Sequence, residues 1–342
     1  MKKIFTLLLI VFVTATVISA QRVFVKAGAT GDGSSWVAAT GDLKGALDAA
    51  SAGTEIWVAK GTYYAITCGS CDFTAQSTYF ELKDGVQLIG GFSGSETNMS
   101  QRDPATNLTI LSGDIDQDGT LSGNAFTVLY TRNVSEATVV DGFTITMASA
   151  TTTGGSTESH FQSGAWFNDG SLQGFRSNPV VRNCIFKDNE AIAHGAAMFN
   201  YGGFSGEASV QYEQCSFLNN YSINAGGAVY SNAVFSGRAS AKFTDCIFDN
   251  NTSDNSGGAV FNNGAEGGIS NATFVDCEFS NNTSTKVDGG AVYSFGKNGE
   301  SSPGFTDCQF IKNTAHLFGG AVVNDGSFTG KSDAAFLRCS FT

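Results

Sequence analysis

A strict period of 31 residues dominates the C-terminal half of this 342-residue chain. Cysteine recurs at this interval, and a phenylalanine follows two positions after each cysteine. The cysteines of the series are Cys184, Cys215, Cys246, Cys277, Cys308 and Cys339. A fixed period of this length is typical of a solenoid, in which each repeat is one coil that buries its apolar face by stacking on its neighbours.

The coil at residues 241–263 predicts three short strands separated by polar corners. Phe243 and Cys246 are three positions apart, so the chain must bend between them if both side chains point inward. Cys246 and Phe248 are two positions apart and share one face of a strand. Asn251 follows at a corner, where stacked asparagines can hydrogen-bond from coil to coil. These features predict an all-β, right-handed parallel β-helix.

A Gly-Gly-Ala-Val group follows the asparagine corner and allows a sharp turn. It occurs at 226–229, 257–260, 289–292 and 319–322, with degraded versions at Gly195 and Gly164. Together with the phased Phe-x-x-Asn motif, it resembles the repeat of bacterial polymorphic outer-membrane proteins, defined by GGA[ILV] and FxxN. The resemblance covers residues 160–342. It implies a right-handed β-helix on a bacterial surface that acts as an adhesin or passenger.

Residues 21–150 look like an irregular opening of the same solenoid. The stretch DLKGALDAA, beginning at Asp42, predicts a short amphipathic helix that caps the open N-terminal end. This part is similar to exported pectin-lyase-like β-helix proteins. Residues 151–342 are predicted to be the regular 31-residue repeats. Because Thr342 falls midway through a coil, we expect that further coils or an attachment module follow.

The first twenty residues predict a secretory signal peptide. Lys2 and Lys3 give the positive start, an apolar run follows, and Ser19-Ala20 offers a small-residue cleavage site. The run is short and lacks a basic flank, which argues against a membrane anchor. No other stretch is apolar enough to cross a membrane. We expect a protein that is secreted or held at the outer membrane or cell surface of a bacterium.

The formal net charge is −12, and removal of two lysines with residues 1–20 brings it to −14. This charge argues against nucleic acids and anionic lipid surfaces as partners. Eight cysteines in an exported chain first suggest disulfides. However, in-register side chains of a parallel sheet point the same way, so we expect the phased cysteines to be a file of buried thiols. Cys68 and Cys71 lie outside the register and predict a small disulfide clip, with a redox CxxC pair as the alternative.

One segment has the pattern of a cation-binding loop. Asp114, Asp116 and Asp118 alternate and are followed by Gly119, which permits a sharp turn. Three carboxylates on one side of a loop are ligands that Ca²⁺ prefers. The twelfth position of such a loop is Ala125, where a bidentate Glu is expected. The alternatives are therefore a Ca²⁺ site and a solvated acidic turn.

No set of residues predicts catalysis, so the catalytic residues stay unknown. Asp245, Asp276 and Asp307 fall once per coil, and their period explains them as corner residues. His194 beside a glycine resembles the His-Gly of polygalacturonase-like hydrolases, but the paired aspartates of that family are missing, and we interpret it as a turn residue. His160 and His316 have no phased partners.

An aromatic residue follows the Gly-Gly-Ala-Val group or its degraded forms in successive coils. This aromatic file consists of Phe167, Phe199, Tyr230, Phe261 and Tyr293. Neighbouring residues of a strand point to opposite faces, so either the Val file or the aromatic file must face outward. An exposed file could stack on sugar rings or dock a partner. Alternatively, the long loop of each coil folds over the file and buries it.

These features favour an exported or surface-displayed β-helix protein that binds glycans or partner surfaces without its own catalysis. The alternative is a polysaccharide-active enzyme, either a pectate-lyase-like lyase or a glycoside hydrolase. A hydrolase would need two nearby carboxylates. A lyase would need a base and a cation, often Ca²⁺, to neutralise the sugar carboxylate. The ligand itself is not encoded in any motif of the chain.

Overall fold

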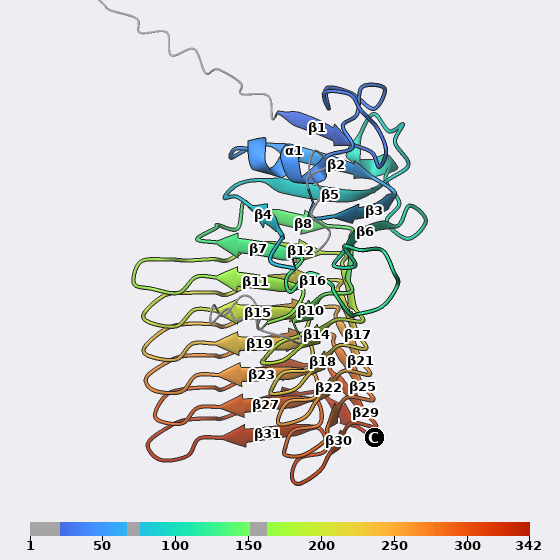
Figure 1. Ribbon diagram of the computed structural model, residues 1–342. Coiled ribbons are helices and arrows are strands. Elements are labelled where there is room, and N and C mark those ends of the chain that lie inside the picture. Colours follow the sequence, from blue (N-terminus) through green and yellow to red (C-terminus); the bar gives the residue numbers. More distant parts are fainter. Residues whose placement is uncertain (1–20, 67–75, 151–162) are drawn as a thin grey trace, which may run out of the picture.

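The computed structural model is a parallel β-solenoid, which confirms the predicted fold class. It describes residues 21–66, 76–150 and 163–342. The predicted signal peptide, Cys68, Cys71 and His160 lie outside the described residues. Figure 1 shows the coils stacked in one column, with the N-terminal strands and α1 at one end and β31 near the other.

Four parallel sheets run along the column, and every strand pairs with the equivalent strand of the neighbouring coil. The first sheet contains β1 (Arg22–Val25), β2 (Glu55–Ala59), β5 (Gln87–Phe92), β8 (Val139–Asp141), β12 (Val180–Arg182), β16 (Gln211–Glu213), β20 (Lys242–Thr244), β24 (Thr273–Val275), β28 (Gly304–Thr306) and β32 (Ala335–Leu337). The second contains β3 (Gly61–Tyr64), β6 (Thr109–Ser112), β9 (Thr144–Thr146), β13 (Ile185–Lys187), β17 (Ser216–Leu218), β21 (Ile247–Asp249), β25 (Glu278–Ser280), β29 (Gln309–Ile311) and β33 (Ser340–Phe341).

The two remaining sheets complete each coil. The third contains the two-residue strands β10 (Ser149–Ala150), β14 (Glu190–Ala191), β18 (Tyr221–Ser222), β22 (Thr252–Ser253), β26 (Thr283–Ser284) and β30 (Thr314–Ala315). The fourth contains β4 (Phe80–Leu82), β7 (Leu129–Arg132), β11 (Trp166–Asp169), β15 (Met198–Tyr201), β19 (Val229–Asn232), β23 (Val260–Asn263), β27 (Val292–Phe295) and β31 (Val322–Asp325).

The regular coils therefore have four strands, and the expectation of three was wrong. The extra strand is the short Thr-Ser or similar pair between the asparagine corner and the glycine pair, as at Thr252–Ser253. Two residues are too few to show the alternation of apolar and polar side chains that marks a strand in a sequence. Backbone pairing with the coils on both sides nevertheless keeps this segment extended.

The corners form where the sequence predicts them. Asp245, between Phe243 and Cys246, has a φ of 52°, and this left-handed residue makes the expected bend. At the next sharp corner, Gly257 has a φ of 69°. A Cβ atom on Gly258 would lie 2.1 Å from the carbonyl oxygen of Gly290 in the next coil. The first glycine of the pair is thus required by its backbone angle and the second by the close approach of two coils.

Two stacks of aromatic rings fill the core. In the first sheet, Tyr212 stacks on Phe243 with ring centroids 4.6 Å apart and planes at 2°. In the second sheet, Phe217 stacks on Phe248 at 4.7 Å and 5°. The two stacks meet edge to face, since Phe243 and Phe248 lie at 5.3 Å and 69°. Stacking within a sheet and edge contact between sheets are both favourable arrangements for aromatic pairs.

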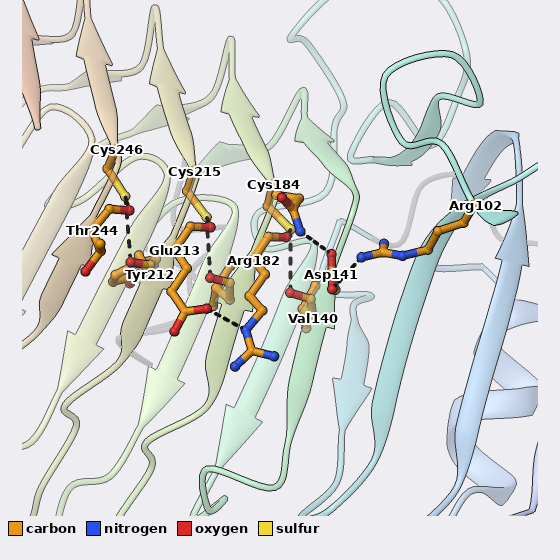
Figure 2. A network of polar contacts seen from close by, with 12 residues as sticks. Arg102, Val140, Asp141, Arg182, Cys184, Tyr212, Glu213, Cys215, Thr244 and Cys246 are labelled. Atoms are coloured by element: carbon orange, nitrogen blue, oxygen red, sulfur yellow. Dashed lines mark hydrogen bonds and ion pairs between the residues drawn. The ribbon is translucent and has the colours of Figure 1, made fainter. Parts of the chain in front are cut away.

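The phased cysteines form the predicted file of free thiols. Five are buried, and Cys339 in the last coil is half-buried. Figure 2 shows the Sγ atoms of Cys184, Cys215 and Cys246 directed at carbonyl oxygens. Cys246, for example, donates to Thr244 at 3.3 Å and to Tyr212 of the preceding coil at 3.8 Å. Burial raises the pKa of the Cys184 thiol to about 12. The cysteines therefore act as small core residues and weak donors.

The asparagines form the predicted amide ladder. The Nδ2 of Asn220 donates to the Oδ1 of Asn251 at 2.9 Å, and Asn251 donates to Asn282 at the same distance. Each amide also donates to a carbonyl of the preceding coil, as Asn251 does to Phe217 at 2.9 Å. The ladder thus satisfies buried corner groups that have no partner within the sheets.

The N-terminal end carries the predicted capping helix, α1 (Leu43–Ala49). The Asp42 carboxylate caps the helix by accepting the Gly45 N–H at 2.8 Å, and Leu43 and Leu47 are buried in the main core. A short 3-10 helix, η1 (Met99–Gln101), also lies in this part of the chain. No helix among the described residues combines the length and apolar composition needed to cross a membrane.

A polar network centred on Asp141 joins the irregular coils to the regular ones. Arg102, just after η1, pairs with Asp141 of β8 at 2.7 Å, and both side chains are largely buried. The second oxygen of Asp141 accepts the Nδ2 of Asn183 at 2.8 Å. Figure 2 shows this contact beside the first of the phased cysteines. Asp141 therefore holds a loop of the N-terminal part against the start of the repeats.

Candidate functional site

The acidic loop lies between β6 and β7 and brings its three aspartates together. Ligand oxygens of Asp114, Asp116 and Asp118 lie within 4.8 Å of one another. The Asp114 carboxylate accepts the N–H groups of Asp118 at 3.1 Å and Gly119 at 3.2 Å, which closes the loop. Asp116 and Asp118 are exposed, so their remaining oxygens can reach an ion from solvent. The donor set consists of hard oxygens and fits Ca²⁺. Ala125, at the twelfth position, adds no side-chain ligand.

The Val file faces the core and the aromatic file faces outward. Val229, Val260 and Val292 belong to the main core, whereas the aromatic file forms a second cluster. Phe167, Phe199, Tyr230 and Phe261 are only 3–9% exposed, and Tyr293 is half-buried. The rings follow one another closely, as Tyr230 and Phe261 do at 5.1 Å and 16°. The file is thus outside the core but covered.

The cover on the aromatic file includes groups other than the long loop that the sequence suggested. Tyr201, at the end of β15, packs on Phe199 at 5.7 Å. His194, from the turn before the degraded glycine group, stacks on Tyr230 at 4.1 Å. Phe261 stacks face to face with Tyr230 and Tyr293, whereas Phe167 and Phe199 meet edge to face at 70°. Contacts within the file therefore cover much of its ring surface.

The candidate catalytic groups take the roles of corner residues. Asp245, Asp276 and Asp307 have φ angles of 52°, 52° and 56°, and each turns the chain from the first sheet to the second. Asp307 also forms an ion pair with Arg338 of the next coil. His194 is half-buried, and desolvation of its ring lowers its pKa to about 4, so the ring is neutral near pH 7. His316 lies exposed in the last coil.

The sequence interpretation missed a row of exposed apolar side chains in the loops that follow the fourth sheet. We call this row the loop-edge ladder: Leu172, Phe204 and Phe235. Phe204 and Phe235 are 47% and 52% exposed, and their rings stack at 5.0 Å and 25°. The available signal was the Phe-Ser-Gly tripeptide, which occurs at 204–206 and again 31 residues later.

The loop-edge ladder is held in an unusual backbone conformation. Leu172, Phe204 and Phe235 have φ angles of 80°, 53° and 58°, a region that bulky residues rarely adopt. Hydrogen bonds between neighbouring loops fix it, with the Phe204 N–H donating to Val234 at 3.0 Å and the Ser205 N–H to Phe235 at 3.1 Å. Strained backbone that surrounding contacts maintain is common at binding and functional sites.

Two coils match a known repeat. The model of the Chlamydia polymorphic membrane protein repeat matches residues 245–263 and 276–294. Each matched segment runs from a corner aspartate through Phe-x-x-Asn and Gly-Gly-Ala-Val to the fourth sheet. A search of curated proteins gives no significant match. The chain therefore carries repeats of the polymorphic membrane protein type, as its motifs predict.

Proposed function

We propose that this chain is a surface-displayed binding protein of the adhesion type that recognises glycans and has no catalysis of its own. Repeats of the polymorphic membrane protein type suggest display at a bacterial surface or outer membrane. A stack of short loops on a rigid solenoid gives an extended surface for partners. The net charge of −12 favours partners that are not polyanions.

The observation that carries this proposal is the loop-edge ladder. Two half-exposed phenylalanines are kept at loop tips in a conformation that costs about 1–3 kcal/mol per residue. The loop fold imposes a similar φ at the equivalent residues Glu266 and Asn298, at 51° and 53°. What distinguishes these two coils is therefore the stacked pair of half-exposed phenyl rings. Exposed aromatic rings can stack on the apolar faces of sugar rings, and Ser205 and Ser236 place hydroxyl groups beside them.

The previously predicted aromatic file is a weaker binding candidate than the loop-edge ladder. Its rings cover one another, so a sugar would meet edges rather than faces. Tyr293, the half-buried member, is the one with the most accessible ring edge, and its hydroxyl donates to Asp325 at 3.1 Å. Unchanged glycan affinity of a Tyr293→Ala variant would show that the aromatic file is not part of the binding surface.

A glycan array probed with the mature chain tests the proposal. The decisive variant is Phe204→Asn/Phe235→Asn, because asparagine tolerates a positive φ. We expect this variant to melt at the same temperature as the wild type or higher, and to lose about tenfold or more in affinity. The matched control is Val275→Thr, which changes an exposed apolar residue of β24 in the first sheet. Unchanged glycan binding by the double variant, or its unfolding, would contradict a binding role.

A specific groove keeps the enzyme alternative open to test. The outer face of β21, β25 and β29 forms a groove of about 410 Å³ that includes Asp249 and Glu278 from neighbouring coils. Two carboxylates in one groove are the minimum that glycoside hydrolysis requires. Asp249 already accepts hydrogen bonds from Ser280 at 2.9 Å and Asn281 at 2.8 Å. Chain cleavage of pectic, alginate or glycosaminoglycan polymers that Asp249→Asn or Glu278→Gln abolishes would establish an enzyme instead.

A further inference from the structure

A cavity of about 540 Å³ lies at the N-terminal end of the solenoid, in a part of the chain separate from the loop-edge ladder. Its walls are the loop at 27–31, residues 40–43 at the start of α1, and Thr62–Tyr64 of β3 with Ile66. Gln117, from the acidic loop, completes the lining. The volume is in the range of small-molecule sites. We call it the N-terminal pocket; Figure 1 shows α1 and β3 at that end of the column.

Two glycines of the N-terminal pocket allow backbone segments to cross closely at its wall. A Cβ atom on Gly31 would lie 2.2 Å from the carbonyl oxygen of Ala38, and one on Gly41 would lie 2.5 Å from that of Ala29. The two chain segments cross too closely for any side chain at these positions. Backbone therefore forms this wall, which leaves space for a ligand in contact with main-chain groups.

Several polar side chains of the pocket are available to a ligand. Within the described part of the chain, the side chains of Thr62, Tyr64 and Gln117 make no hydrogen bond. Together they offer two hydroxyls and one amide, which can each donate and accept. Asp42 contributes a carboxylate, one oxygen of which caps α1. The available groups therefore suit a ligand with several hydroxyls.

The charge of the pocket excludes an anion. The lining contains Asp42 and no lysine or arginine. Burial, and then the nearby Asp114 carboxylate, raise the pKa of Tyr64, so its hydroxyl keeps its proton near pH 7. The ring of Tyr64 and the side chain of Ile66, both half-buried, supply apolar surface. A pyranose has this combination of apolar face and hydroxyl rim.

We propose that the N-terminal pocket binds a neutral monosaccharide unit, free or at the end of a glycan. This site is additional to the loop-edge ladder and does not depend on it. Thr62, Tyr64 and Gln117 hydrogen-bond the sugar hydroxyls, and the Tyr64 ring packs against its apolar face.

Saturation-transfer NMR and calorimetry on the mature chain test this site. The probes are the methyl glycosides of glucose, galactose and mannose, with galacturonate as the anionic comparison. The variants Thr62→Val and Tyr64→Phe each remove one hydroxyl with little change in shape, and Thr283→Val in β26 is the matched control. We expect a neutral glycoside to bind, galacturonate to bind more weakly, and each pocket variant to lose about three- to tenfold in affinity.

Three results would overturn the pocket proposal: no transfer to any neutral glycoside, galacturonate binding as tightly as these, or pocket variants with the affinity of the control. The variant Phe204→Asn/Phe235→Asn should keep its pocket affinity. The glycan array therefore tests the loop-edge ladder, and the glycoside titrations test the N-terminal pocket. Either proposal can fail without the other.

Discussion

Replacing Asn251 by alanine should be among the most destabilising single changes in the regular coils. Asn251 is fully buried in the middle of the amide ladder. Its Nδ2 donates to the carbonyl of Phe217 and to Asn282, both at 2.9 Å. Its Oδ1 accepts the N–H of Asn220 at 3.1 Å and the Nδ2 of Asn220 at 2.9 Å. Alanine removes all four contacts.

The expected cost follows from the groups left behind. Two buried backbone groups, the Asn220 N–H and the Phe217 carbonyl, lose this partner. A buried polar group that is left unsatisfied costs about 1–3 kcal/mol, so the free energy of unfolding should fall by about 2–6 kcal/mol. Asn313 makes similar bonds in the last coil but is half-buried, so water can replace its amide. Asn313→Ala should therefore cost about 1 kcal/mol or less.

Urea unfolding followed by circular dichroism measures this difference, with hydrogen exchange of the neighbouring amides to locate it. We expect the midpoint to fall much further for Asn251→Ala than for Asn313→Ala, and exchange to accelerate at Asn220. Equal effects of the two changes would show that burial does not determine how much each asparagine of the ladder contributes to the free energy of unfolding. A loss of less than 1 kcal/mol for Asn251→Ala would refute the reasoning itself.

Three further predictions concern the acidic loop, the thiols and His194. If the aspartates hold Ca²⁺, the ion at a hundred times its dissociation constant should stabilise the fold by about 2.7 kcal/mol. We expect a higher melting temperature with Ca²⁺, and Asp116→Ala should abolish this increase. A melting temperature that neither Ca²⁺ nor a chelator changes would show that the loop is an ordinary acidic turn. In a Cys68→Ser/Cys71→Ser background, a thiol reagent should modify Cys339 first and the buried five cysteines only on unfolding, whereas fast labelling of several would contradict the buried file. Burial lowers the pKa of His194 to about 4, against about 6.5 in an unfolded chain, so the unfolded state binds the proton first. Stability present above pH 6.5 should thus be lost as the pH falls to 4, by up to about 3 kcal/mol, and His194→Gln should flatten this part of the pH profile.

The sequence predicts those features of the fold that every coil needs. A cysteine or asparagine at one position of each coil lies directly above its counterpart, so its period reveals the register without any structure. The sequence also predicts two corners. The bend at Asp245 follows from the spacing of the inward-pointing residues on either side of it, and the turn at Gly257 follows from the absence of side chains in the glycine pair. The capping helix after Asp42 carries a local signal of its own.

Other features depend on packing that the sequence does not display. Val260 and Phe261 are both apolar and alternate on one strand, so periodicity alone cannot say which faces the core. In the structure Val260 faces the main core and Phe261 faces outward, an assignment that depends on how the coils pack. The cover on Tyr230 comes from His194 in the preceding coil, a contact that depends on coil stacking.

The places where the period breaks are where the individual function of this solenoid should be sought. Residues that are needed for coil stacking recur in every coil, so their recurrence reflects the fold rather than binding of a ligand. At the loop-edge position the residue changes along the column, from Phe204 and Phe235 to Glu266 and Asn298, and it is again a phenylalanine at Phe328. A stacking requirement would not permit such a change. The stacked pair of Phe204 and Phe235 is therefore a local property of two neighbouring coils, which suits recognition of one partner at one place on the column.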